Sequence, residues 1–470
     1  HIAEMRIERV FAVLTAGLMP MLLTAEPKTV SLDECLTIAL SDNPTVKIAD
    51  MEVERLDYSK REVIGQLLPT IDFGATYSRM LAKQVMYMNM DGFGDMGGSG
   101  NDGAEENSRA GEKKDNGIKM GLDNSYSLGF QASLPLIAPQ LWKSIGVSDT
   151  QILRSLESAR QSRQSLVNQV KNAYYTLLLA QDSRKVIQES YDMAALTNRT
   201  YQQQREAGAA SDYDVLRTSV AMKNIEPEIV QADIAIKQAR LQLLILMGLD
   251  SNFELEAASQ LSDYEAGMYE TVLSINPDYS GNSDLRLLDI DSKLLKQNLD
   301  IQNLAFVPTL SLTANYNWTS MSNGSPFSNF RWNPYSTIGV TLSVPIFHGG
   351  QRINKVKQAK IQFAETQWQR ENLERSISMQ VDLAIDNIQL NVKQIASSSE
   401  SVAEADSAHT IMEKSFGIGA ASYLDLRDSE LSLTRARLAY YQAIYNYLVA
   451  GSNLELLLGN APIERYTSEK

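Results

Sequence analysis

Cysteine, histidine and excess positive charge are all scarce in this chain of 470 residues. The single cysteine, Cys35, excludes an intrachain disulfide and every zinc site built from several cysteines. The internal histidines, His348 and His409, have no partner motif for nucleophilic catalysis. The 57 Asp and Glu residues outnumber the 43 Lys and Arg residues, so the net charge of −14 leaves no basic patch for nucleic acid. We therefore predict that the chain is not an enzyme, binds no nucleic acid and carries no cofactor or metal.

Long apolar runs are missing beyond the N-terminus. Residues 5–9 are basic in character, 10–23 are apolar and Ala25 is small, which is typical of a secretory signal peptide at 1–25. A membrane anchor is the alternative, but Pro20 interrupts the run, which is shorter than the about 20 residues that a spanning helix needs. If the chain spans a membrane, we expect it to do so with strands.

Proline is absent from two long stretches, 140–226 and 346–461. Apolar residues recur there at helical spacing, for example at Val167, Val170 and Ala173. One helix over 140–205 would be about 100 Å long at ~1.5 Å per residue. Such lengths favour coiled-coil-like packing, and Pro227 predicts a kink after the first long helix.

Four segments alternate strictly between apolar and polar residues, at 70–77, 125–134, 309–319 and 337–344. They are close to the roughly 9–11 residues of a tilted transmembrane strand. Two half-buried hairpins of a soluble sheet are the alternative. Aromatic residues near one end of the second hairpin favour the membrane interpretation, because they suit an interfacial girdle. They are Tyr316, Trp318, Phe327, Phe330, Trp332 and Tyr335.

The second half of the chain repeats the order of the first. Residues 128–136 correspond to 338–346, an offset of 338 − 128 = 210. Gly208 corresponds to Gly419, and Gly248 to Gly459, both at an offset of 211 (419 − 208 and 459 − 248). We therefore expect a structural duplication, with copies too long for a solenoid repeat.

Two copies of Gly-Ala-Ala-Ser predict tight turns between helices. In each copy the glycine ends one helix, the serine caps the next, and Asp214 or Asp425 three residues later completes a capping box. Small residues at such tips also suit docking by another helical hairpin. The candidate docking residues are Gly208, Ala209, Ser211, Gly419, Ala420 and Ser422.

Asp425 and Asp428 lie three residues apart, on one face of the helix that follows the second tip. Interaction with the helix dipole explains them without any function. In a symmetric oligomer whose tips converge on an axis, they would instead form a ring of carboxylates that selects cations.

Residues 87–121 form a glycine-rich insert, which we predict to be an external loop. Residues 92–97 match G-x-G-x-x-G but lack the preceding strand and following helix that dinucleotide binding needs. Residues 97–102 resemble a calcium-binding nonapeptide repeat, but a single copy cannot stack into the array that binds calcium. Met86, Met88 and Met90 suit either a soft metal such as Cu(I) or apolar packing near the rim.

Four strands cannot close a barrel, and open strand edges are not tolerated in lipid. Closure therefore requires several chains. The predicted helices would extend from the same ends of the strands, so the hairpins of all subunits would form a second tube.

With these features, the sequence resembles the TolC-type outer membrane efflux proteins. The resemblance rests on residues 345–350 at a strand-to-helix exit, the Pro-Thr strand starts at Pro69 and Pro308, the two glycine-containing tips and the closing segment 456–459. It covers nearly the whole mature chain, from Ser31 to Gly459.

The resemblance implies an α+β membrane protein that forms a homotrimer. Four strands per chain would build a 12-stranded transmembrane β-barrel in outer membrane lipid, continuous with a long periplasmic α-helical barrel. The tips would dock on a periplasmic adaptor protein bound to an inner membrane pump.

The resemblance also assigns a periplasmic gate. Asp425 and Asp428 match its aspartates, and Phe416 stands where the type member has a tyrosine that helps to hold the tip shut. Ala421 stands where that member has an arginine, so the resemblance does not carry its closing salt bridge over to this chain.

The corresponding domain division has eight parts. They are a signal peptide (1–25), N-terminal periplasmic helices (26–66), barrel hairpin 1 (67–136, with external loop 87–121), helical hairpin 1 (137–248), an equatorial region and helix (249–306), barrel hairpin 2 (307–346, with external loop 320–335), helical hairpin 2 (347–459) and a C-terminal tail (460–470).

The predicted function is that of a passive outer membrane exit duct, to which a pump and an adaptor deliver the substrate. A duct for type I protein secretion is the alternative within the same class. A soluble periplasmic coiled-coil scaffold or adaptor is the alternative from another class.

Overall fold

The computed structural model describes residues 28–86, 118–268, 278–327 and 331–467. The predicted signal peptide, Met88, Met90 and the glycine motif at 92–97 lie outside these residues. The chain divides into two compact units. Unit 1 contains the described residues up to 54, 153–291 and those from 366 onward, and unit 2 contains 55–152 and 292–365.

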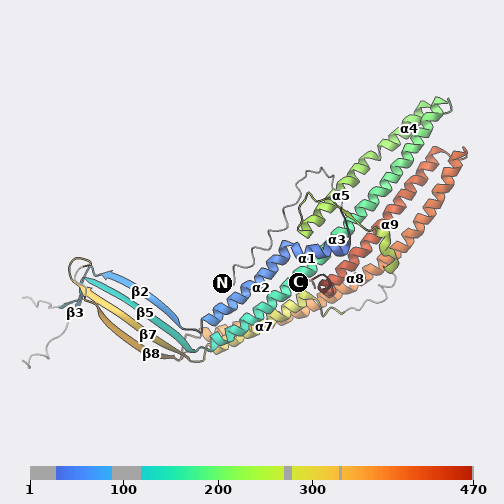
Figure 1. Cartoon of the computed structure of the whole chain (residues 1–470). Coiled ribbons are helices and arrows are strands. Elements are labelled where there is room, and N and C mark those ends of the chain that lie inside the picture. The colour runs from blue at the N-terminus through green and yellow to red at the C-terminus, as the bar shows by residue number, and fades with distance from the viewer. Residues whose placement is uncertain (1–27, 87–117, 269–277, 328–330, 468–470) are drawn as a thin grey trace, which may run out of the picture. The chain divides into compact units, whose positions relative to one another are not determined.

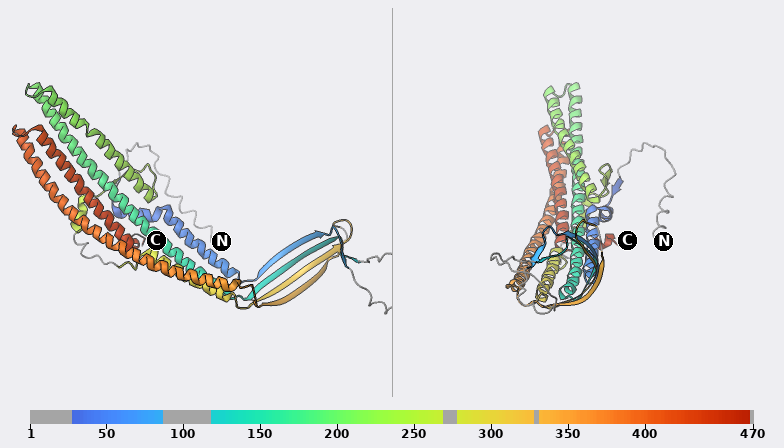
Figure 2. Two further views of the ribbon diagram at one scale, coloured as in Figure 1. Left: turned by 180° about the vertical axis from the view of Figure 1, so that it is seen from behind. Right: turned by 90° about the vertical axis from the view of Figure 1, so that its left-hand side faces the viewer.

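Unit 2 contains a four-stranded antiparallel sheet. Its strands are β2 (Thr70–Arg79), β5 (Asn124–Ile137), β7 (Thr309–Ser322) and β8 (Asn333–Ser343), in the order β2-β5-β7-β8 (Figure 1). All four predicted strands are therefore confirmed. The sheet twists and curves along its length, as Figure 2 shows.

Apolar side chains share one face of this sheet, as the alternation predicts. Phe73 pairs with Phe130, which pairs with Tyr316 on the next strand. The rings of Phe73 and Phe130 are 5.0 Å apart, and those of Tyr77 and Tyr126 are 4.9 Å apart. Such cross-strand aromatic pairs stabilise the register of the sheet.

Two predicted loop boundaries were wrong. Strands β7 and β8 extend into the predicted loop 320–335, because Trp318 pairs with Pro334 and Thr319 with Asn333. Pro334 is the second residue of β8, so its missing N–H falls at the start of the ladder with β7. The predicted loop 87–121 also ends too late, because β4 (Ile118–Met120) pairs with β3 (Gln84–Met86).

The long helices have residues in both units. They are α2 (Pro44–Gly65), α3 (Pro139–Glu206), α7 (Ser283–Leu304) and α8 (Gln351–Gly417). Helix α3 confirms the single helix expected over 140–205. Within unit 2, Lys60 pairs with Asp149 at 2.7 Å and Lys143 with Asp300 at 2.8 Å. Among the described residues, no helix is both long enough and apolar enough to cross a membrane.

Unit 1 contains the remaining elements. They are β1 (Lys28–Val30), α1 (Leu32–Asp42), α4 (Asp212–Lys223), α5 (Glu226–Met247), β6 (Leu255–Ala257), the 3₁₀-helix η1 (Leu261–Gly267), α9 (Tyr423–Leu458) and α10 (Ile463–Thr467). Strand β1 pairs in parallel with β6. Cys35 is fully buried in α1, in the same core as Tyr174, Met247 and Ile444. It is therefore an ordinary helix position, as expected.

Pro227 marks a break between two helices. Helix α4 ends at Lys223, and α5 begins at Glu226 with Pro227 in its first turn. Proline fits there because the N–H groups of a first turn have no partner within the helix. The corresponding helix of the second half, α9, runs unbroken from Tyr423 to Leu458.

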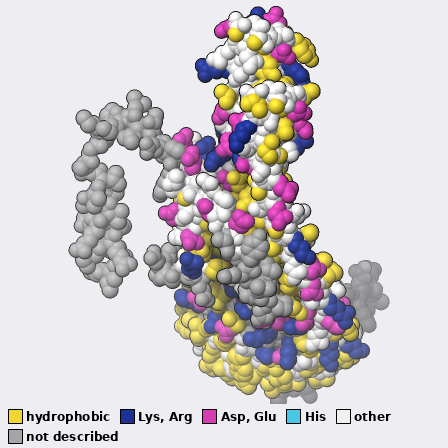
Figure 3. All heavy atoms as spheres, turned by 90° about the vertical axis from the view of Figure 1, so that its right-hand side faces the viewer, with side chains coloured by type: hydrophobic (Ala, Val, Ile, Leu, Met, Phe, Trp, Pro, Cys, Tyr) yellow, Lys and Arg dark blue, Asp and Glu magenta, His cyan; other side chains and the backbone are white. Residues whose placement is uncertain are grey.

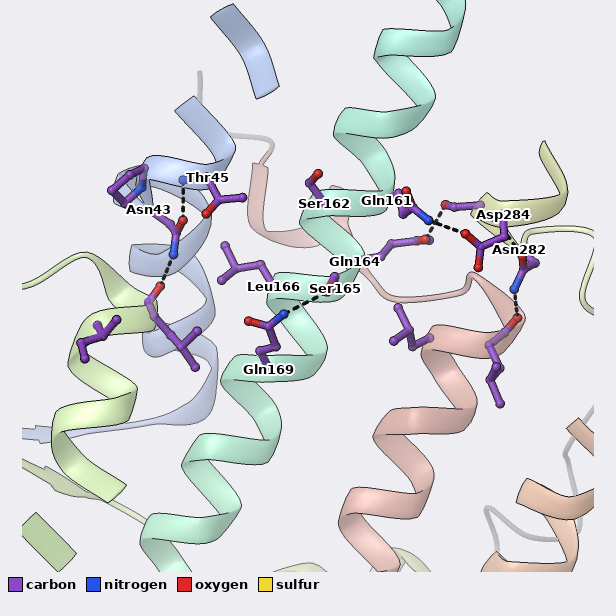
Figure 4. Close-up of a pocket in the computed structure, with 16 residues that line it drawn as sticks. Asn43, Thr45, Gln161, Ser162, Gln164, Ser165, Leu166, Gln169, Asn282 and Asp284 are labelled. Carbon is purple, nitrogen blue, oxygen red and sulfur yellow. Dashed lines mark hydrogen bonds between the residues drawn. The ribbon is translucent and has the colours of Figure 1, made fainter. Parts of the chain in front are cut away.

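Two asparagines make matching contacts in unit 1. The Asn43 side-chain amide donates to the Leu246 carbonyl at 2.7 Å and its oxygen accepts from the Thr45 N–H (Figure 4). The Asn282 amide donates to the Leu457 carbonyl at 2.8 Å, and its oxygen accepts from the Asp284 N–H. Each asparagine thus ties the start of α2 or α7 to the last turn of α5 or α9.

A glycine with positive φ caps each of these last turns. Gly248 and Gly459 both have φ of 70°. A Cβ at Gly248 would lie 3.0 Å from the Asp42 carbonyl oxygen, whereas one at Gly459 would lie 2.0 Å from the Gly281 oxygen. The second junction is therefore packed more tightly than the first.

Alanine substitutions at three glycines should separate backbone strain from steric clash. Gly208→Ala has open space around the Cβ and should cost only the left-handed backbone strain, about 1 kcal/mol. Gly248→Ala should lower the unfolding temperature further, and Gly459→Ala most of all, because its Cβ overlaps backbone. Thermal unfolding of the detergent-purified variants, followed by circular dichroism, measures the order. Equal shifts for all three would contradict the close packing at Gly459.

Candidate functional site

The turn between α3 and α4 is closed by backbone and side-chain caps. The Gly208 N–H donates to the Arg205 carbonyl at 2.9 Å, with Gly208 at φ 77°. The Ser211 hydroxyl donates to Asp214 Oδ2 at 2.6 Å and accepts from the Asp214 N–H at 3.2 Å. Arg205 and Asp212 form an ion pair across the turn. The predicted tight turn and capping box are confirmed.

The turn between α8 and α9 has the same construction. The Gly419 N–H donates to the Phe416 carbonyl at 3.0 Å, with Gly419 at φ 75°. The Ser422 hydroxyl donates to Asp425 Oδ2 at 2.7 Å and accepts from the Asp425 N–H at 3.3 Å. Both turns lie at the same end of unit 1 (Figure 1).

Asp425 and Asp428 differ in their surroundings. The hydrogen bonds from the Ser422 side chain and backbone lower the pKa of Asp425, which therefore stays ionised at neutral pH. Asp428 is exposed one turn further along α9. Two residues later Glu430 is buried, and burial raises its pKa.

An aromatic cluster joins the two hairpins near their tips. The ring of Phe416 on α8 lies 6.1 Å from that of Tyr201 on α3. Tyr201 lies 5.8 Å from Tyr423 on α9, and the Arg217 guanidinium stands over the Tyr423 ring at 5.0 Å. Aromatic ring pairs and cation–π contacts of this kind are each favourable by about 1 kcal/mol. Phe416 therefore joins its own hairpin to the neighbouring one.

Large apolar side chains are exposed around both tips. Figure 3 shows hydrophobic atoms among charged ones at the upper end of the molecule. The exposed apolar residues of the tip segments are Tyr213, Leu216, Val220, Ile418 and Leu424. The predicted docking residues Gly208, Ala209, Ser211, Gly419, Ala420 and Ser422 are also exposed, apart from the backbone atoms that the caps use. Apolar groups exposed beside polar ones are typical of surfaces that bind another protein.

The sheet exposes its apolar face in the isolated chain. Ile71 on β2 is 71% exposed and Ile338 on β8 is 77% exposed. Both strands are edges of the sheet, and every residue of each is exposed. Within the described part of this chain, no other element packs on the apolar face or pairs with the two edge strands.

Sequence reasoning found the caps and the two aspartates but missed Tyr201, Arg217 and Tyr423. These three residues are distant in the chain and meet only because the two hairpins pack together. The one available signal was the position of Tyr423 and Phe416 on either side of the second turn.

Comparison with known proteins gives a consistent result. The sequence profile described as outer membrane efflux protein matches residues 35–249 and 280–460. TolC of Vibrio cholerae serotype O1, an outer membrane protein, is 22% identical over 341 residues, which cover 71% of this chain and 76% of that protein. The alkaline protease secretion protein AprF of Pseudomonas aeruginosa is 26% identical over 356 residues, covering 72% of this chain and 70% of that protein.

A solved structure shares the fold. The crystal structure of the Campylobacter jejuni CmeC outer membrane channel superposes with a TM-score of 0.69 and 17% identity, covering 95% of this chain and 93% of that one.

This chain belongs to the outer membrane efflux protein family. It is an efflux channel of the outer membrane, and the predicted family, function and localisation are confirmed.

Ser422→Ala should loosen the second tip without unfolding the chain. It removes the hydroxyl that both donates to and accepts from Asp425, and loss of such a cap costs about 1 kcal/mol. Amide hydrogen exchange should rise in the first turn of α9 and stay unchanged in the first turn of α4, which provides an internal control. Unchanged exchange at residues 423–426 would contradict the role of the cap.

Acid should affect the second tip in two opposite directions. The folded-state pKa of Glu430 is raised above 4.5, so its protonation as pH falls through that raised value should stabilise the tip. The folded-state pKa of Asp425 is lowered below 3.8, so its stabilisation should begin to be lost near 3.8 and disappear as pH falls through the lowered value. Hydrogen exchange of residues 423–430, compared at each pH among the wild type, Glu430→Gln and Asp425→Asn, should show each variant losing one of the two effects. Identical profiles for all three proteins would contradict both assignments.

Proposed function

We propose that three copies of this chain assemble into a passive exit duct. Each copy contributes its four-stranded sheet to one 12-stranded transmembrane β-barrel (3 × 4 = 12). The helical hairpins of the three copies form a periplasmic α-barrel that continues the duct.

The exposed sheet carries this proposal. Backbone groups at an open edge cost several kcal/mol each in hydrocarbon, so β2 and β8 require strand partners in the membrane. Pairing β8 of one copy with β2 of the next satisfies both edges and repeats until the sheet closes. The exposed apolar face, including Ile71 and Ile338, then faces lipid.

An internal duplication accounts for the two similar halves. The matching contacts of Asn43 and Asn282, and the two equivalent capped tips, support it. We retain the domain division given above as part of this proposal, apart from the two loop boundaries corrected by β4, β7 and β8. The sheet loops then lie outside the cell and the tips in the periplasm.

Substrate enters at the tips. A periplasmic adaptor contacts the exposed segments around Gly208 and Gly419, and an inner membrane pump supplies the energy. The exposed apolar residues at both tips support a docking role, since they would otherwise remain in water.

The ring of Asp425 and Asp428 forms the gate, with Phe416 holding it closed. The capping box keeps Asp425 ionised, and Asp428 is exposed next to it. The contact of Phe416 with Tyr201 joins the second hairpin to the first, so opening must separate these rings.

A duct for type I protein secretion is a second candidate. The similarity to AprF, a protease secretion protein, favours it, and both functions use the same architecture. Transport of a small substrate and of an unfolded polypeptide by the reconstituted system would distinguish the two.

Conductance in planar bilayers, together with the oligomeric mass in detergent, tests the assembly. Discrete channels from a trimer are expected. A monomer that never inserts would overturn the proposal and favour a soluble periplasmic scaffold.

Neutralising the acidic ring should reduce cation selectivity. Asp425→Asn with Asp428→Asn removes two negative charges per chain while keeping side-chain size, so the reversal potential in a salt gradient should move toward zero. Asp212→Asn at the first tip is the matched control and should leave the reversal potential unchanged. An unchanged potential in the double variant would contradict the gate.

A further inference from the structure

The two long helices α3 and α8 occupy corresponding positions in the two halves of the chain. Helix α3 corresponds to α8 at an offset of 211, taken from the tips (419 − 208). The positions buried in both helices agree with this offset. They are Ser155 and Thr366, Leu166 and Ile377, Val170 and Val381, and Leu177 and Ile388.

Helix α3 has a second buried side, which packs against the junction of α7 and α9. The Gln164 amide donates to the Gly459 carbonyl at 2.7 Å, and its oxygen accepts from the Ser283 hydroxyl at 2.8 Å. Arg160 donates to the Gly281 carbonyl at 2.6 Å. We call the contact of Asn43 with the end of α5 the Asn43 junction, and that of Asn282 with the end of α9 the Asn282 junction. Figure 4 shows α3 between these two junctions. Helix α3 therefore lies between the two junctions and is hydrogen-bonded to the Asn282 junction.

Helix α8 lacks this second contact within the described chain. The residue that corresponds to Gln164 is Arg375 (164 + 211). Gln164 is 2% exposed, whereas the Arg375 side chain is 76% exposed. Met379 and Asp382 on the same side of α8 are also exposed, and together with Arg375 they define the open face of α8.

Part of the Asn43 junction is exposed, although Asn43 itself is buried. Gly459 and Ser283 are buried under α3, but their counterparts Gly248 and Pro44 are exposed. The counterparts follow from offsets of 211 (459 − 248) and 239 (282 − 43). Within the described residues, the chain thus has one exposed helix face, on α8, and one partly exposed junction, around Asn43. The matching face of α3 and the Asn282 junction are buried against each other.

We propose that the open face of α8 in one subunit covers the Asn43 junction of a second copy, where Arg375 donates to the backbone carbonyls of Asp42 and Gly248. This repeats between subunits the contact that α3 makes within the chain. The proposal rests on the trimeric duct proposed above and identifies the residues that join its subunits.

The chemistry of Arg375 fits this contact. Arg160 and Gln164 together supply the donors to the carbonyls of Gly281 and Gly459. Arginine carries five donors in a planar fork and can serve both carbonyls alone. Glu371, one turn earlier, pairs with Arg375 and holds the guanidinium on the open face.

The inter-subunit contact differs from the internal one nearer the tips. Arg437 on α9 pairs with Glu189 on α3 at 2.7 Å. Their counterparts are Glu226 (437 − 211) and Glu400 (189 + 211), which are both acidic. The subunits are therefore held together at the Asn43 junction rather than by an ion pair close to the tips.

Thiol cross-linking tests the contact. The Gln161 amide donates to Asp284 Oδ1 at 2.5 Å, and the counterparts of these residues are Asn372 and Thr45, which are both exposed. In a Cys35→Ala background, Thr45→Cys with Asn372→Cys is treated with a short bismaleimide in detergent. Covalent trimers are expected on a denaturing gel, with nothing larger, because each subunit is linked to both neighbours.

Three controls calibrate the experiment. Gln161→Cys with Asp284→Cys should cross-link within one chain and give no oligomer band. Each single variant, Thr45→Cys or Asn372→Cys, should also give no oligomer band. Adding Arg375→Ala to the double variant should weaken subunit association by about tenfold, since hydrogen bonds from a charged group are lost, while Arg375→Lys should retain part of it.

The outcomes separate this proposal from the proposed function. A trimeric mass without cross-linking, while the internal control pair does cross-link, would overturn this interface and leave the duct intact. A monomeric mass would overturn the trimer and the interface together.

Discussion

The unpaired edges of the four-stranded sheet impose the constraint on which the other features of this protein depend. In lipid, the backbone groups of β2 and β8 require hydrogen-bond partners, and a single chain offers none within its described residues. The apolar face of the sheet likewise requires a surface other than water. A family of outer membrane channels is consistent with both requirements, because strands from several copies can close on one another.

Unit 1 also leaves part of a repeated contact exposed in the single chain. Unit 1 is held together by a core that includes Tyr174, Met247 and Ile444, and by two asparagine junctions that tie helix starts to helix ends. Gly459 and Ser283 at one junction are buried, whereas Gly248 and Pro44 at the other are exposed. The open face of α8 and the exposed part of the Asn43 junction are therefore suited to pair between identical copies.

Each tip has its own cap, and a separate cluster of side chains joins the two tips. The capping boxes at Ser211 and Ser422 are local and satisfy the first N–H groups of the next helix, so each turn is held by contacts within its own hairpin. The cluster of Tyr201, Phe416, Tyr423 and Arg217 joins different hairpins through rings alone. Its contacts are individually weak, so the opening that we propose would break them without breaking a cap.

Much of this architecture was determined by the sequence itself, because its signals are local. Alternation predicted the four strands, the absence of proline predicted α3, and Gly-Ala-Ala-Ser predicted both tips. Local patterns missed the extension of β8 through Pro334, since proline usually argues against a strand and only the pairing with Trp318 reveals this one. The tertiary structure alone decided that Tyr201 meets Phe416, and that Gln164 is buried while Arg375 is exposed. Those contacts depend on which helices pack together. No periodic pattern in the sequence links residues that are so far apart in the chain.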